Sequence, residues 1–138
     1  MIQLIQLYFV ALTVAMEAGG EPYLGKLAVA WVIANRRTKY SRSLLDVVMD
    51  PHDFSCWNTD SPTRANLDRI ADSQFAECLK AAIAACFGME GDPTKGAVFY
   101  MNTDVVQKTV GKLPDWWSID GDFNSEVKIG AHTFRRHK

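Results

Sequence analysis

Two glutamates lie four residues apart around a pair of glycines, and their surroundings suit acid–base chemistry. Glu17 falls at the end of an apolar segment with helical spacing, which Gly19-Gly20 can terminate. A carboxylate in the last turn faces the negative end of the helix dipole, which disfavours its ionised form. Glu21 precedes Pro22, a residue suited to the first turn of a new helix, where the dipole favours the ionised form. The pair therefore indicates one acid that keeps its proton beside one that loses it.

Helical segments and two short extended segments are expected to position these glutamates. The patterns predict helices over 1–16, 22–37, 43–49 and about 72–87, and β-like runs at 97–100 and within 127–135. The expected apolar positions are Ile5, Phe9, Leu12 and Met16 in the first helix; Leu24, Leu27, Ala28, Trp31, Val32 and Ile33 in the second; and Phe75, Leu79, Ala82, Ile83 and Cys86 in the last, with Asp72 or Ser73 as its cap. The breadth of the second set predicts a central helix. We expect a mainly α (α+β) fold, in one domain spanning residues 1–138.

Composition excludes several classes of function. A formal charge of −1 gives no general case for nucleic-acid binding, although Lys128, Arg135, Arg136, His137 and Lys138 form a basic tail that suits either an anionic polymer or a solvated terminus. The three cysteines include no CxxC pair, which argues against a disulfide framework and a zinc site, so we expect reduced thiols and neither metal nor cofactor. No apolar run has the length of a membrane span. The apolar start lacks a basic region and is interpreted as the first helix, not as a secretion signal.

Five groups of motifs follow one another along the chain. They are 17–23, 25–30 with 35–36, 54–58, 92–97 with 99–102, and 129–134. In order and spacing they resemble the cell wall hydrolase family of spore cortex-lytic enzymes, over nearly the whole chain. The resemblance implies a small lysozyme-like domain that cleaves the MurNAc–GlcNAc bond of peptidoglycan as a lytic transglycosylase. It also implies that Glu17, the first glutamate of the acidic motif, is the general acid and base.

The sequence departs from this family pattern in two ways. The family usually has an arginine where Gly19 or Gly20 stands, so we expect a basic contact near Glu17 to be missing. We also expect the protein to lack the peptidoglycan-binding repeats and the signal peptide of spore enzymes. A bare catalytic domain of this kind resembles a bacteriophage endolysin, so we expect a monomer made in the host cytoplasm that reaches the periplasm or cell wall after the membrane is permeabilised.

Other residues are candidates for contact with a glycan. Ser55, Trp57, Tyr100, Asn102 and His132 carry the aromatic faces and polar groups that a sugar cleft uses. Trp57 and His132 also suit a purely structural role, and the pair Trp116-Trp117 suits either a loop anchor or a second sugar platform.

Three alternatives to the lytic transglycosylase remain at this point. A hydrolytic muramidase would use Glu21 as a second catalytic carboxylate, whereas an anion at a helix start would only stabilise that helix. Cys56 followed later by His132 suggests a cysteine peptidase or amidase. A non-catalytic wall-binding module would keep the cleft but not the reaction.

Overall fold

The computed structural model describes residues 2–50, 53–58, 61, 65 and 67–138, and of Ser55 only the backbone. The helical body consists of α1 (Leu4–Ala18), α2 (Tyr23–Tyr40), α3 (Leu44–Met49) and α4 (Asp72–Cys86), with the 3-10 turn η1 (Ser55–Trp57) after α3. The second part contains β1 (Phe99–Met101), β2 (Val127–Ile129) and β3 (His132–Arg135), together with α5 (Thr103–Val110), α6 (Asp115–Ile119) and the 3-10 turn η3 (Phe123–Ser125). The expected mainly helical fold with a small β region is confirmed.

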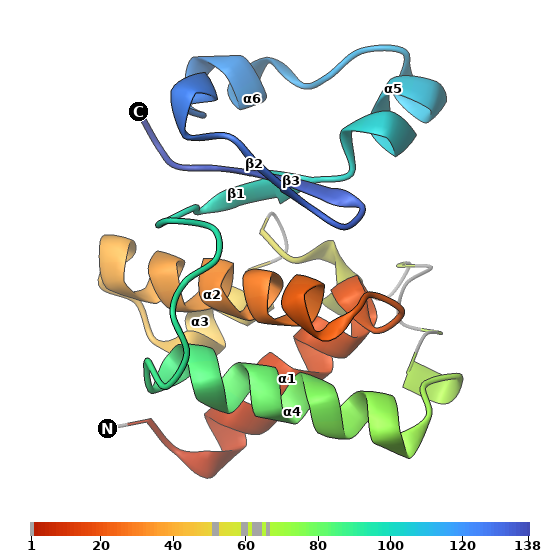
Figure 1. The fold of residues 1–138 in the computed structure, drawn as a ribbon, viewed down its shortest axis with the longest axis vertical. Coiled ribbons are helices and arrows are strands. Elements are labelled where there is room, and N and C mark those ends of the chain that lie inside the picture. The colour runs from red at the N-terminus through yellow and green to blue at the C-terminus, as the bar shows by residue number, and fades with distance from the viewer. Residues whose placement is uncertain (1, 51–52, 59–60, 62–64, 66) are drawn as a thin grey trace.

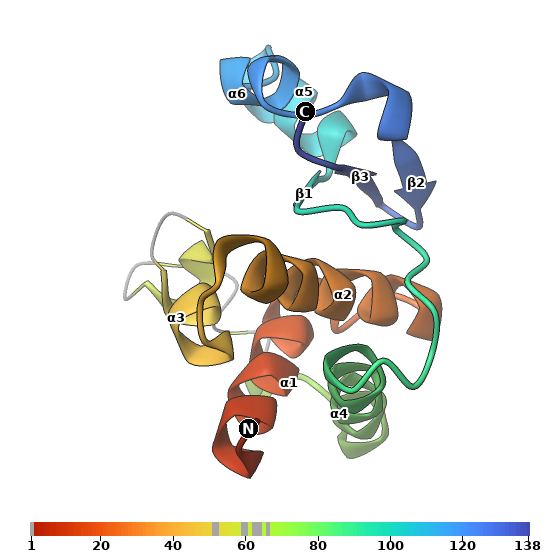
Figure 2. The same ribbon diagram turned by 90° about the vertical axis from the view of Figure 1, so that its left-hand side faces the viewer.

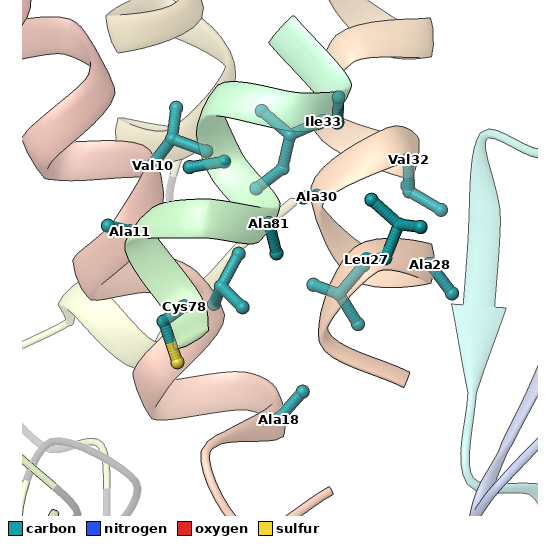
Figure 3. Close-up of a cluster of buried hydrophobic side chains, with 14 of the residues drawn as sticks. Val10, Ala11, Ala18, Leu27, Ala28, Ala30, Val32, Ile33, Cys78 and Ala81 are labelled. Atoms are coloured by element: carbon teal, nitrogen blue, oxygen red, sulfur yellow. The ribbon is translucent and has the colours of Figure 1, made fainter. Parts of the chain in front are cut away.

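The two parts form layers, with α2 in the middle (Figures 1 and 2). One face of α2 packs against α1 and α4, and the sheet lies over its other face, with α5 and α6 beyond the sheet. Figure 3 shows the core where these helices meet: Val10 and Ala11 of α1, Ala81 of α4 and Ile33 of α2 are fully buried. Small side chains on α4 permit close packing of the helices. The predicted central position of the second helix is confirmed.

The sheet has the order β1-β3-β2, and both of its pairings are antiparallel. Tyr100 pairs with Phe134, and Ile129 pairs with His132. The extended run expected within 127–135 is thus a tight hairpin that turns at Gly130, whose φ is +58°. This register presents Tyr100 and His132 on neighbouring strands, with their rings 5.2 Å apart.

Some sequence-based expectations were wrong. Ile5 and Leu24 are exposed, because the buried faces of α1 and α2 are rotated away from them. The cap of α4 is Ala71, whose N–H donates to the side chain of Gln74, and not Asp72 or Ser73. Arg135 does not belong to an exposed basic tail: it is buried and forms an ion pair with Glu126 at 2.6 Å.

Helices α5 and α6 were not predicted; they span only eight and five residues. None of the helices in the described part of the chain combines the length and apolarity that a membrane crossing requires.

Candidate active site

A cleft of about 1060 Å³ is lined by residues of both layers, and Glu17 forms part of its wall. Arg36 enters the wall from α2, Tyr100 from β1 and His132 from β3. Trp116 of α6 also contributes to the lining. The structure therefore brings together Glu17 and three of the expected glycan contacts, Tyr100, Asn102 and His132, which lie more than 80 residues from it in the sequence.

Glu17 occupies the position expected from the sequence, in the last turn of α1. Gly19 caps this helix, and its N–H donates to the carbonyl oxygen of Ala15 at 3.0 Å. The Glu17 side chain is half-buried. A carboxyl group at this place is exposed to the negative end of the α1 dipole while remaining open to the cleft.

Tyr100 is the phenol that faces Glu17. Burial is the main cause that holds the pKa of Tyr100 well above its ordinary value, and the negative charge of Glu17 acts in the same direction. The ring is held in place by stacking on Phe134, at a centroid distance of 5.7 Å. Tyr100 therefore stays protonated at neutral pH, and its phenol O–H is available to a carboxylate in the cleft.

Glu21 is directed at the hairpin between β2 and β3. Its Oε1 accepts a hydrogen bond from the N–H of Ala131 at 3.0 Å. A Cβ at Gly130 would lie only 2.7 Å from Oε2 of Glu21, so a glycine is required for this close approach. The Glu21 carboxylate thus connects the start of α2 to the sheet layer, which is the role expected if this residue is structural.

His132 lies between the two glutamates. Its Nδ1 is 3.5 Å from Oε1 of Glu21, is buried, and has no hydrogen-bond acceptor among the described residues. Burial lowers the pKa of His132, and the attraction of Glu21 and of Glu17 offsets this only in part. The imidazole is therefore neutral at neutral pH, and its contact with Glu21 becomes an ion pair only in acid.

Arg36 is a functional candidate to which the sequence analysis gave no role. Its side chain is 8% exposed, its Nε donates to the carbonyl oxygen of Val98 at 2.7 Å, and its guanidinium lies over the ring of Phe54. The basic group thought to be missing near Glu17 is therefore supplied to the same cleft by α2. An arginine four residues after the buried Val32 of a central helix is the sequence signal that could have identified it.

The remaining predicted contacts are placed differently. Asn102 lines the cleft, but its Oδ1 caps α5 by accepting from the N–H of Val105 at 3.1 Å. The indole N–H of Trp57 donates to Thr13 at 2.9 Å and its ring packs against Phe9, which favours the structural role weighed for it. The side chain of Ser55 lies outside the described residues.

The thiol of Cys56 is fully buried. It is not among the described residues that line the cleft, although it lies near one of them, Tyr100. This position disfavours a Cys56–His132 nucleophile pair, because a nucleophile must reach its substrate.

Comparisons with known proteins agree with this architecture. A family model described as Cell Wall Hydrolase matches residues 20–135, a range that begins just after Glu17. A spore cortex-lytic enzyme of Bacillus cereus is 33% identical over 126 residues, which cover 86% of this chain and 39% of that protein. The chain thus spans well under half the length of this relative.

Two solved structures are similar over their whole length. One is the catalytic domain of the germination-specific lytic transglycosylase SleB from Bacillus anthracis, with a TM-score of 0.68 and 28% identity over 98% of this chain and 97% of that one. The other is the catalytic domain of the Bacillus cereus SleB protein, with a TM-score of 0.65 and 26% identity over 99% of this chain and 93% of that one. The expected lytic transglycosylase-like fold is confirmed.

Proposed function

Because the chain belongs to the Cell Wall Hydrolase family, we propose that it cleaves the glycan strands of bacterial peptidoglycan as a lytic transglycosylase acting on the MurNAc–GlcNAc bond. The observation that carries the proposal is Glu17, set in the wall of a large cleft that Tyr100 also lines, where the phenol and the carboxyl group interact electrostatically. The similarity to the catalytic domain of a lytic transglycosylase supports the choice of reaction.

The first half of the reaction requires a carboxylic acid. The protonated Glu17 donates its proton to the glycosidic oxygen, the bond from that oxygen to C1 of the muramic acid breaks, and the sugar ring becomes oxocarbenium-like. The Tyr100 hydroxyl stabilises the carboxylate that results, since a hydrogen bond to an anion is stronger than one to a neutral acid.

The second half requires a base, and the same residue supplies it. The Glu17 carboxylate accepts the proton of the 6-hydroxyl of the muramic acid as that oxygen bonds to C1, which closes a 1,6-anhydro ring and restores the acid. No water and no second carboxylate take part. The position of Glu21 supports this route over a hydrolytic muramidase, because its carboxylate is engaged with Ala131 and Gly130 of the hairpin.

Product analysis tests the proposal. Wild-type protein is incubated with purified peptidoglycan, and the masses of the released muropeptides are measured by mass spectrometry. We expect 1,6-anhydromuramic ends; reducing ends would indicate the muramidase, new amino termini would indicate the peptidase, and binding without release would indicate the wall-binding module.

A pair of variants tests the role of Glu17. Glu17→Gln should lower release by at least about 1000-fold while leaving binding to the glycan intact. The exposed Asp68→Asn carries the same change of charge in the helical body and should retain full activity. Loss of activity in Cys56→Ala but not in Glu17→Gln would reject the proposal.

The endolysin setting remains a prediction. It requires that the protein, expressed inside a bacterial host, lyses the cells only when a membrane-permeabilising protein is co-expressed. Lysis without such a partner would contradict the expected release from the host cytoplasm.

A further inference from the structure

Arg36 carries a positive charge that is buried in the wall of the cleft. Its Nη1 is covered from solvent and has no hydrogen-bond partner among the described residues. Nor does any carboxylate of the described residues lie within ion-pair distance of it, whereas Arg42 and Arg135 both have such partners. A buried charge without a counter-ion is costly, and proteins keep such charges mainly where they serve a function.

The surroundings of Arg36 fix it in place without neutralising it. The bond from Nε to Val98 and the contact with the Phe54 ring, 4.7 Å from Cζ to the ring centroid, hold the guanidinium rigidly. Burial lowers the pKa of Arg36, and the attraction of nearby groups, Glu17 among them, opposes that effect. An arginine remains charged under such conditions. Because Nη1 is covered, a sugar bound in the cleft cannot contact it.

We propose that Arg36 is a positioning residue that stabilises the Glu17 carboxylate as the acid gives up its proton. The inference rests on the proposed function, in which a negative charge develops on Glu17 during the first half of the reaction. A fixed cation that need not reorganise at that moment lowers the energy of the transition state more than that of the bound substrate. Tyr100, which interacts with both Glu17 and Arg36, belongs to the same arrangement.

Other charged and titratable groups face this site from each neighbouring element. They are Tyr40 at the end of α2, Arg42, Asp50 and Asp53 around α3, Tyr100 on β1, His132 on β3, and Glu21 in the turn between α1 and α2. Arg42 is held by Asp50 and Asp53 at 3.2 and 3.1 Å, so its charge is largely compensated. His132 is neutral above its lowered pKa. Arg36 is therefore the uncompensated cation among these described groups.

The test compares three variants over a range of pH. Arg36→Gln removes the charge, Arg36→Lys keeps it, and Arg37→Gln makes the same change of charge at the next position of α2, outside the lining of the cleft. We expect Arg36→Gln to lower kcat about 10- to 100-fold with little change in KM. We also expect its alkaline limb of activity to move up by about 1 pH unit, because Glu17 then holds its proton to higher pH. Arg36→Lys should keep the wild-type profile, and Arg37→Gln should match the wild type.

Several outcomes would overturn the inference. The inference is wrong if Arg36→Gln folds and the alkaline limb of its pH–activity profile stays where it is in the wild type. It is also wrong if Arg36→Gln changes KM but not kcat. If Arg36→Gln fails to fold, the test uses Arg36→Lys alone. A shift of its alkaline limb of activity, although the positive charge is retained, would reject the electrostatic role of Arg36.

A readout without substrate separates this inference from the proposed function. The carboxyl carbon of Glu17 is titrated by NMR in the wild type and in Arg36→Gln, with Arg36→Lys in its place if the glutamine variant does not fold. The inference requires the midpoint to rise in Arg36→Gln and to stay in place in Arg36→Lys. If the wild type leaves peptidoglycan uncleaved, the proposed function fails while this titration still decides the coupling.

Discussion

Replacement of Glu21 tests whether its carboxylate has a structural or a catalytic role. In the structure its Oε1 accepts the N–H of Ala131, on a hairpin 110 residues away in sequence, and its side chain is only 16% exposed. A hydrogen bond to a charged group contributes about 1.5–3 kcal/mol, and one between neutral groups about 0.5–1.5 kcal/mol. We therefore expect Glu21→Gln, which can keep a neutral bond, to lower the free energy of unfolding by about 1 kcal/mol.

Glu21→Ala should cost more than Glu21→Gln. It leaves the Ala131 N–H without its acceptor and opens a gap against Gly130, so about 2–3 kcal/mol is expected. For a chain of this size, about 4 °C of melting temperature corresponds to 1 kcal/mol. The melting temperature should thus fall by about 4 °C for glutamine and about 8–12 °C for alanine.

The assay combines thermal melting with the rate of muropeptide release at a temperature where each variant is folded. A structural Glu21 predicts that Glu21→Gln retains activity within about 5-fold of the wild type, since the reaction needs only Glu17. Activity that drops more than 100-fold in Glu21→Gln at nearly unchanged stability would refute this reasoning and identify Glu21 as the second carboxylate of a muramidase. Unchanged stability in both variants would show that the carboxylate does not hold the hairpin.

Four further predictions concern other buried and exposed side chains. Burial lowers the pKa of His132 below its ordinary value of 6.5, so the folded protein binds this proton less readily than the unfolded chain. Stability should therefore fall as the pH drops below about 6.5, and His132→Gln should reduce that loss in urea unfolding at pH 7.5 and 5. Trp116 lines the cleft and is 41% exposed, as expected for an aromatic platform under a sugar. Trp116→Ala should therefore raise KM about 5- to 10-fold with kcat nearly unchanged. An unchanged KM would reject that role. Trp117, 1% exposed, is the anchor of the pair, and Trp117→Ala should cost about 3–5 kcal/mol of unfolding free energy. Burial raises the pKa of Cys78 and of Cys86 to about 11 each, so both thiols should resist iodoacetamide at pH 8 until the protein is unfolded, and fast labelling of the native protein would contradict their packing.

The sequence predicted the parts of this fold that depend on local pattern. Glu17 was placed at the end of a helix because two glycines follow an apolar segment, and α1 does end at Ala18. Helix α5 was missed because it spans only eight residues, Thr103–Val110, and its few apolar side chains form a stripe too short to stand out; none of its residues is buried. Its signals were Asn102 as cap and Gly111 as stop, but the sequence analysis had assigned Asn102 to the glycan.

The candidate site was only half predictable, because its geometry depends on contacts between distant segments. The sequence identified Glu17, Tyr100 and His132 as members of motifs but could not show which of them meet. The interaction between Tyr100 and Glu17 joins residues 83 positions apart, and the Glu21–Ala131 hydrogen bond joins residues 110 positions apart. No local periodicity carries such information.

Polar contacts between the layers explain why Tyr100 meets Glu17 at all. Asn35 donates to the carbonyl oxygen of Ala97 at 3.0 Å, and the next residue of α2, Arg36, donates to that of Val98 at 2.7 Å. Both acceptors come directly before β1, so two consecutive side chains of α2 fix where that strand begins. The strand then places Tyr100 near Glu17 at the end of α1, while Glu21 holds the turn of the β2–β3 hairpin. Arg36 thus acts in two ways. Its Nε bond to Val98 aligns the strand that brings Tyr100 close to Glu17, and its charge acts on the Glu17 carboxylate.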